Sequence, residues 1–180
     1  LLHVAAEIGC EDVLEFLVAK GADVNAKING GWRPLHFAAL NGQRNATEFL
    51  IAKGAQVNAK SNGGYTPLYS AVRYWRKDVA ELLIAQGADI NAKDGDGRTI
   101  LFNAIKDKHY SMAKILIAKG ADVNAKDKWG NSCLHYCKDK DVAELLIAKG
   151  ANVNAKGNFG YTPLDVASSK DMVEILIAKG

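Results

Sequence analysis

The sequence contains few cysteines and no long hydrophobic run, and these two absences exclude several classes of protein. No stretch of the 180 residues approaches the roughly 18 consecutive apolar residues that a membrane-spanning helix needs, so we expect no membrane insertion. Cysteine occurs three times, at Cys10, Cys133 and Cys137. A small, odd number argues against a disulfide-stabilised scaffold and favours a reducing compartment, hence an intracellular and cytoplasmic location.

The sequence also lacks a large excess of positive or negative charge. The chain has 23 Lys and Arg residues against 20 Asp and Glu residues, a formal net charge of +3. This excess is smaller than a nucleic-acid-binding or membrane-surface protein would show. Hydrophobic residues make up 48% and charged residues 24% of the chain. That composition is typical of a folded globular chain and not of a disordered one.

The dominant feature of the sequence is an internal repeat. The motif Gly-Ala-(Asp/Gln/Asn)-(Val/Ile)-Asn-Ala-Lys begins at residues 21, 54, 87 and 120, at intervals of 33, and again at residue 150. A second motif follows each copy, as in Gly64-Tyr-Thr-Pro-Leu-Tyr69. Periodicity of this length indicates repeated units, each of which buries its apolar face against its neighbours.

Each unit predicts two short helices followed by a turn. Thr66-Pro67, Thr99 and Thr162-Pro163 are typical of the first residues of a helix. In the segment 78–86, apolar residues at helical spacing predict a second helix with one buried face, formed by Val79, Leu82 and Leu83. Glycines follow the second helices at 87, 120 and 150, where a left-handed backbone is favourable.

The 33-residue period with Gly-x-Thr-Pro-Leu-His and Gly-Ala-Asp-Val-Asn-Ala resembles the ankyrin repeat over the whole chain. The resemblance implies an all-α ankyrin-repeat solenoid of helix-loop-helix units joined by β-hairpin-like turns. We expect one domain, 1–180, of about six repeats with incomplete ends. The repeats are placed at 1–27 (partial), 28–60, 61–93, 94–126, 127–156 and 157–180 (partial).

The fifth and sixth repeats are shorter than the others. Leu134 and Leu146 are 12 residues apart, as is the equivalent pair in the sixth repeat, whereas Leu35 and Leu50 are 15 apart. The missing residues fall at the end of the first helix and in the loop after it. The sequence therefore predicts a shortened first helix in both repeats.

We find no constellation of catalytic or metal-binding residues in the sequence. His3, His36 and His135 all occupy the histidine of the motif, and the resemblance implies that this side chain ties one turn to its neighbour by hydrogen bonds. Cys133-Leu-His-Tyr-Cys137 places two thiols on one helix face, but a structural zinc site needs four ligands and no second pair is near. We therefore expect no enzymatic activity, no cofactor, no metal and no small-molecule substrate.

Function is then expected from the surface. The resemblance implies that a protein or peptide partner binds the concave groove formed by the turn tips and first helices. Trp, Tyr and Arg dominate interface hot spots. The candidate partner-binding residues are Trp32, Asn41, Tyr65, Arg73, Tyr74, Trp75, Arg98, Lys106, Trp129, Asn131, Phe159 and Tyr161, and Asn158 holds another tip position. For Trp32, Tyr65 and Tyr161, packing against the neighbouring turn is an equal alternative.

The segment Arg73-Tyr74-Trp75-Arg76-Lys77 has the densest grouping of such residues. Aligned with residues 40–44, it places Trp75 where the previous repeat has Gly42. Two aromatic rings and three cations favour an anchor for an acidic or aromatic peptide. The alternative is that Trp75 covers the core while the cations are solvated.

Charge is distributed unevenly along the repeats. Residues 28–156 carry net positive charge, whereas 1–27 and 157–180 are net negative. We hypothesise an acidic protein partner over the second to fourth repeats. Two lysine series, one closing each turn and one following the second helices, leave nucleic-acid binding as a less favoured alternative, because these lysines recur only as the unit recurs. The chain could equally be the ankyrin segment of a larger signalling, channel, or bacterial or viral effector protein.

Overall fold

The computed structural model describes residues 1–157 and 159–180, which divide into two compact units, Leu1–Gly95 and Asp96–Gly180. The first unit contains α1 (Leu2–Ile8), α2 (Glu11–Ala19), the short 3-10 helix η1 (Asn29–Gly31), α3 (Pro34–Asn41), α4 (Arg44–Ala52), α5 (Pro67–Arg73) and α6 (Lys77–Ala85). The second contains α7 (Ile100–Lys106), α8 (Tyr110–Ala118), α9 (Cys133–Tyr136), α10 (Lys140–Ala148) and α11 (Lys170–Lys179). None of the helices in the described part of the chain has the length and apolarity needed to cross a membrane.

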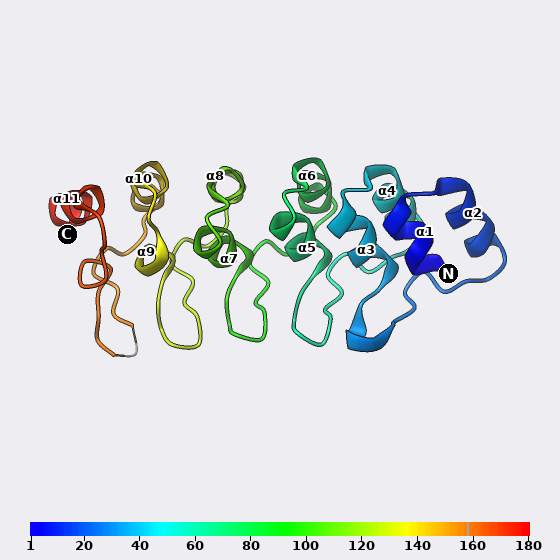
Figure 1. Ribbon diagram of the computed structural model, residues 1–180, viewed down its shortest axis with the longest axis horizontal. Coiled ribbons are helices and arrows are strands. Elements are labelled where there is room, and N and C mark those ends of the chain that lie inside the picture. The colour runs from blue at the N-terminus through cyan, green and yellow to red at the C-terminus, as the bar shows by residue number, and fades with distance from the viewer. Residues whose placement is uncertain (158) are drawn as a thin grey trace. The chain divides into compact units, whose positions relative to one another are not determined.

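Within each unit the helices form two layers. In the first unit, α3 packs between α1 and α5, while α4 packs between α2 and α6. In the second unit, α7 packs on α9, and α10 contacts both α8 and α11. In both units the turns lie on the side of the first helices that faces away from the second helices (Figure 1). The turn tips and the first helices therefore share one surface within a unit.

The core lies between these two layers. The motif leucines of the first helices, Leu35 and Leu68, are 1% and 0% exposed, and Leu50 and Leu83 of the second helices are 0% exposed. Leu101 and Leu116 hold the same places in the second unit and are also fully buried. Each such side chain contributes roughly 1.5–3 kcal/mol by burial. No single helix could form without these contacts, because isolated helices this short are unstable in water.

The helix boundaries are set largely by the residues that the sequence indicated. The hydroxyl of Thr66 accepts from the backbone N–H of Tyr69 at 3.2 Å, and Thr99 accepts from Phe102 at 3.3 Å, which confirms both predicted N-caps. After the second helices, Gly87 and Gly120 have φ of 82° and 88°, as predicted for left-handed helix ends.

Thr162 is the exception among the predicted helix starts. Its hydroxyl and N–H both donate to the carboxylate of Asp165, at 2.8 and 2.7 Å, as in a helix N-terminus. Residues 163–166 nevertheless form a turn and not a helix, so the prediction of a helix there is wrong. The spacing from Thr162 to the α11 N-cap Ser169 equals that from Ser132 to the α10 N-cap Asp139, where α9 does form, so the length of the segment does not explain the difference.

The predicted shortening of the first helices is confirmed. α9 has four residues, whereas α3 has eight and α5 and α7 have seven each. In the following repeat, residues 163–166 form a turn in place of a first helix. The division of the chain into one domain with six repeats stays a prediction.

Candidate protein-binding surface

The turns that carry the candidate residues are held together by backbone hydrogen bonds. Four of the tips are closed by a short-range backbone hydrogen bond, such as Asp127 N–H to Asn131 O at 3.0 Å. Successive tips are also joined, by Asn62 N–H to Gly30 O at 2.8 Å in the first unit and by Lys128 N–H to Asp96 O at 3.0 Å in the second. The tips therefore have a defined spacing within each unit.

Motif histidines add a side-chain tie to this backbone framework. In His36, Nδ1 accepts from Arg33 N–H at 3.2 Å and Nε2 lies 3.0 Å from Tyr65 O in the next turn. His135 makes the same two contacts, to Ser132 and Tyr161. Because Nδ1 accepts, Nε2 carries the proton and donates to the carbonyl oxygen. The histidines thus have the structural role that the sequence predicted.

The two aromatic tips of the first unit pack against their own first helices. The Trp32 ring lies 5.2 Å from His36 and 6.0 Å from Phe37, and Tyr65 stacks on Tyr69 with centroids 4.3 Å apart. Both tip residues are half-buried. One part of each ring therefore packs against the first helix, while the rest of the ring faces solvent.

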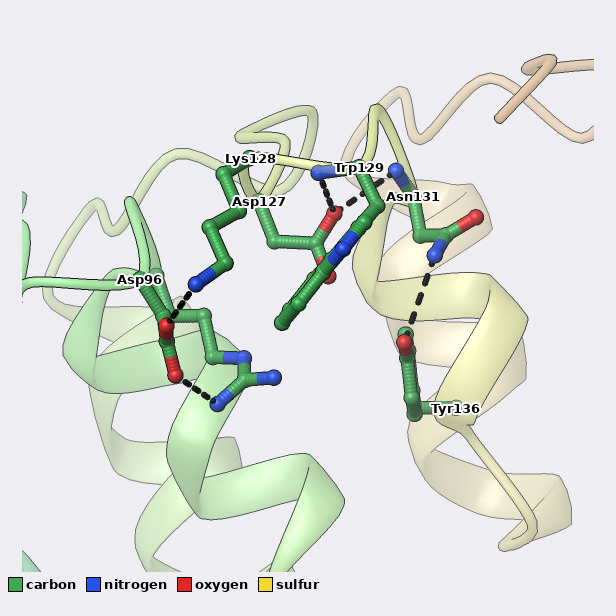
Figure 2. Close-up of polar contacts among 7 residues, drawn as sticks. Asp96, Asp127, Lys128, Trp129, Asn131 and Tyr136 are labelled. Carbon is green, nitrogen blue, oxygen red and sulfur yellow. Dashed lines mark hydrogen bonds and ion pairs between the residues drawn. The ribbon is translucent and has the colours of Figure 1, made fainter. Parts of the chain in front are cut away.

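The Trp129 cluster is the most elaborate grouping at a tip, and Figure 2 shows its polar contacts. The Arg98 guanidinium carbon lies 5.0 Å from the Trp129 ring centroid, and Lys128 Nζ lies 4.5 Å from it. Asp96 bridges the two cations, accepting from Arg98 at 2.8 Å with one oxygen and from Lys128 with the other. The bond from Lys128 and the charges of both cations lower the pKa of the Asp96 carboxyl.

The base of the same cluster fixes the turn that presents Trp129. One carboxylate oxygen of Asp127 accepts from the backbone N–H groups of Trp129 and Asn131, at 3.0 and 2.9 Å. The Asn131 amide then donates to the Tyr136 hydroxyl at 3.2 Å (Figure 2). Asp127 is only 6% exposed, so this arrangement is shielded from solvent. The tip is consequently held by hydrogen bonds within the chain.

Sequence reasoning did not assign roles to Asp127 or Tyr136, nor the bridging role to Asp96. The position of Asp127, two and four residues before Trp129 and Asn131, is typical of an Asx-turn and could have signalled its role. Tyr136 and Asp96 carried no comparable local signal, because their roles depend on contacts between segments that folding brings together.

The candidates at the ends of the first helices differ in exposure. Asn41 is half-buried, and its amide donates to Phe37 O at 3.2 Å. Arg73 and Lys106 are exposed, as are Tyr74 and Trp75, at 47% and 55%. The alternative in which Trp75 covers the core does not fit this exposure. Asn41, Gly42 and Trp75 line one shallow pocket of about 260 Å³, so the structure brings these two loops together.

The last tip is the most exposed. Phe159 and Tyr161 are 81% and 57% exposed, and the Tyr161 carbonyl receives the hydrogen bond from His135. Asn158 lies outside the described residues. Tyr161 is therefore more exposed than Trp32 and Tyr65, which are half-buried against their own first helices.

Two of the lysines that close the turns donate hydrogen bonds to the following turn. Lys60 Nζ donates to Lys93 O at 3.1 Å, and Lys126 Nζ donates to Lys156 O at 3.2 Å. Each lysine thus ties the end of one turn to the next. The recurrence of lysine at this position therefore has a structural cause, which weakens the argument that the lysine series binds nucleic acid.

The cysteines that suggested a metal site are not poised for one. Cys133 and Cys137 are both buried, and the Cys137 thiol donates to Asp139 O at 3.3 Å. Burial raises the pKa of Cys133 to about 12 and that of Cys137 to about 11. Both thiols are therefore protonated at neutral pH in the metal-free chain.

Comparisons with known proteins agree with this architecture. A family model described as ankyrin repeats (3 copies) matches residues 2–94 and 101–180, and another, described as ankyrin repeats (many copies), matches residues 76–117. Among solved structures, the ankyrin repeat domain of Bcl-3, described as a unique member of the IkappaB protein family, is similar. The two are 31% identical with a TM-score of 0.88, over 98% of this chain and 81% of that one. A search of curated proteins found no match. The chain therefore belongs to the ankyrin repeat family, whose repeats are generally protein–protein interaction modules.

Proposed function

We propose that the chain is a non-enzymatic module that binds a protein or peptide partner on the surface formed by its turn tips and first helices. The observation that carries this proposal is the Trp129 cluster. An indole flanked by Arg98 and Lys128, on a turn fixed by Asp127, has the composition of an interface hot spot.

Preorganisation is the mechanism that this geometry supports. The tips are fixed by backbone bonds between successive turns, by the histidine ties and by the Asp127 turn. A rigid surface loses little conformational entropy on binding, so more of the contact energy appears as affinity. Candidate contacts are the sequence-predicted residues, of which Tyr74, Trp75, Phe159 and Tyr161 are the most exposed aromatics.

The cations on this surface support an acidic partner. Arg73 and Lys106 are exposed at the ends of two first helices, and the segments 28–60, 61–93 and 94–126 each carry net positive charge. An acidic partner would be steered to this surface, and its association rate would fall as salt screens the attraction.

The test is affinity capture with two matched variants. Wild type is compared with a variant carrying Tyr65→Ala, Tyr74→Ala, Trp75→Ala and Trp129→Ala, and with a control carrying Glu48→Ala, Lys114→Ala and Glu144→Ala on exposed positions of the second helices. Circular dichroism first establishes that all three fold. A protein that wild type and the control retain, and the aromatic variant loses, supports the proposal.

Two outcomes would count against it. Equal capture by the aromatic variant would move the interface away from the tips and first helices. Binding of the purified partner that is insensitive to raising the salt from about 50 mM to about 500 mM would reject the electrostatic part of the proposal while leaving the surface assignment intact.

A further inference from the structure

Three apolar side chains of the first helix pair are exposed to solvent. α1 and α2 lie at one end of the first unit, where α3 covers one side of α1 and α4 covers one side of α2 (Figure 1). On these two helices, Val4, Val13 and Phe16 are 53%, 43% and 60% exposed. In a stack of repeats, a face that meets only water has to be polar for the protein to be soluble. These side chains therefore suit a covered surface better than a solvated one.

The position of Val4 is one that contacts the preceding repeat elsewhere in the chain. Phe37 holds the place of Val4 in the second repeat, and its ring lies 5.7 Å from that of His3 in the repeat before it. Tyr136 holds this place in the second unit, where its ring lies 5.0 Å from that of Phe102 in the preceding repeat. Val4 thus occupies a contact position but faces solvent.

The same is true of the two side chains of α2. Val79 holds the place of Val13 and is 1% exposed. Leu82 holds the place of Phe16, is 8% exposed, and lines a cavity of about 130 Å³ with residues of α4, the preceding second helix. Lys20 Nζ lies 5.7 Å from the Phe16 ring centroid but leaves that side chain largely exposed. A helix placed before α2 would cover both apolar side chains.

The charge of the helix pair indicates what kind of helix fits. Residues 1–19 contain no Lys or Arg and four carboxylates, those of Glu7, Glu11, Asp12 and Glu15. Glu11 accepts from the Asn45 amide of α4 at 2.7 Å, so it faces the following repeat. Asp12 faces the other way, because Asp141, at the same place in α10, pairs with Lys114 of the preceding second helix at 3.2 Å. Val4, Val13 and Phe16, together with Asp12, therefore form an apolar and acidic outer face.

A second copy of this chain is a poor occupant of the outer face. α2 has three carboxylates and no Lys or Arg, so two copies joined through this helix would repel one another. α11 also has an exposed apolar residue, Ile177, but its two lysines are balanced by Asp171 and Glu174. The excess negative charge of the outer face instead favours a helix with an excess of Lys or Arg.

We propose that the outer face of α1 and α2 binds a cationic amphipathic α-helix of a partner protein. The apolar stripe of that helix covers Val4, Val13 and Phe16, and one of its cations pairs with Asp12, as Lys114 pairs with Asp141. The helix takes the place that a preceding second helix takes in the other repeats. This site goes beyond the proposed function, because it uses none of the turn tips.

The probe is a crosslinked synthetic helix of about 20 residues, long enough to be helical in water. It contains the α8 sequence, which carries Lys114, flanked by Ala and Lys residues. A second peptide, the glutamate helix, has Glu in place of every Lys of this lysine helix. Affinities are measured by fluorescence anisotropy for wild type, Phe16→Ser and Asp12→Lys.

Two variants of α11 are the matched controls. Ile177→Ser removes a side chain that is 65% exposed, close to the exposure of Phe16. Asp171→Lys changes the second residue of α11, as Asp12→Lys changes the second residue of α2, so both lose the same interaction with the helix dipole. Circular dichroism during heating should show each variant unfolding within a few degrees of its control.

Wild type should bind the lysine helix at least about tenfold more tightly than the glutamate helix. Phe16→Ser and Asp12→Lys should each weaken binding of the lysine helix about tenfold, whereas Ile177→Ser and Asp171→Lys should leave it unchanged. The difference between wild type and Asp12→Lys should shrink as salt is raised to about 500 mM. Trp129→Ala should bind the lysine helix as wild type does.

Several results would overturn the inference. Absence of binding, equal binding of the two peptides, or full binding by Phe16→Ser would each contradict it. Loss of binding with Trp129→Ala but not with Phe16→Ser would place the helix at the turn tips, which rejects this site and supports the proposed function. Sedimentation velocity tests the remaining occupant. A wild type that self-associates, and that Phe16→Ser returns to a monomer, would show that a second copy covers the outer face.

Discussion

The full-length repeats and the shortened ones connect their two helices in different ways. In the longer connections, a residue with left-handed backbone, Gly42, Trp75 or Lys108, precedes the second helix. The second helix then begins without a side-chain cap, as at Gln43 and Arg76. In the shorter connection between α9 and α10, Cys137 and Asp139 are extended, with φ of −70° and −102°.

The shorter connection gains a cap where it loses the left-handed turn. The Asp139 carboxylate accepts from Val142 N–H at 2.9 Å, and Ser169 accepts from Met172 N–H at the start of α11. The second helix can therefore be started by either kind of connection. The longer connection has a left-handed position that is occupied by Gly, Trp or Lys, whereas the residues of the shorter connection cap the helix. Variation that serves recognition is thus expected in the longer connections.

The largest expected effect is the loss of stability when the motif leucines are replaced by alanine, and it should differ between the full-length and the shortened repeats. Leu35 and Leu134 are 1% and 2% exposed, whereas Leu164, at the same motif position after the helix has been lost, is 41% exposed. Leu35→Ala and Leu134→Ala should each lower the free energy of unfolding by about 2–5 kcal/mol, through lost burial and a residual cavity. Leu164→Ala should cost less than about 1 kcal/mol, because much of the side chain is already in water.

Urea denaturation followed by circular dichroism measures all three variants. If Leu164→Ala were as destabilising as Leu134→Ala, the last repeat would be packed as tightly as the others in solution. The contrast between the two regions would then be lost.

A smaller effect is expected at the new cap. Asp139→Ala should destabilise by about 1 kcal/mol, since it leaves an N–H group of the first turn of α10 without its acceptor. Asp139→Asn retains an acceptor oxygen and should recover most of this loss. Lys138→Ala, at the exposed neighbouring residue, is the control and should change stability by less than about 0.5 kcal/mol. A comparable loss for Asp139→Asn and Asp139→Ala would indicate that charge, and not capping, stabilises the helix.

Most of the local structure could be predicted from the sequence because the same signals recur in register. Thr66 and Thr99 begin helices, Gly87 and Gly120 end them, and the deletion before Leu146 shortens α9. These features depend on a few neighbouring residues. Thr162 shows where such reasoning fails. Its hydrogen bonds to Asp165 form as the motif predicts, yet no helix follows, although the fifth repeat forms α9 over a segment of the same length.

The binding surface was less predictable, since exposure depends on packing between repeats. The sequence could not distinguish Trp32, which packs on His36 and Phe37, from Trp75, which is exposed. Nor could it show that Asp96 bridges Arg98 and Lys128, because that contact depends on the spacing of two turns 32 residues apart in sequence. The alignment of Trp75 with Gly42 implied a left-handed backbone at Trp75. The exposed fraction of the Trp75 side chain, however, could be learned only from the structure.

The smallest of the three effects is a pH dependence that originates at His36. The motif histidine recurs as His3 and His135, whereas repeats three and four carry Tyr69 and Phe102 at this position. Of the three histidines, His36 is the fully buried one, at 0% exposed. Burial of the His36 ring lowers its pKa, against opposing hydrogen bonds to the Tyr65 and Ala59 backbone. The unfolded chain therefore binds a proton more readily than the native state below about pH 6.5, and stability should fall as the pH decreases through this range.

The structural reason is that Nδ1 must accept from Arg33 N–H, which a protonated imidazole cannot do. His36→Gln should weaken the tie at neutral pH but remove this proton uptake. Its free energy of unfolding should consequently decline less than that of wild type between about pH 7.5 and pH 5. Urea titrations of both proteins at several pH values provide the measurement. Parallel stability profiles would show that the acid sensitivity of the fold arises elsewhere, and that the histidine tie contributes orientation alone.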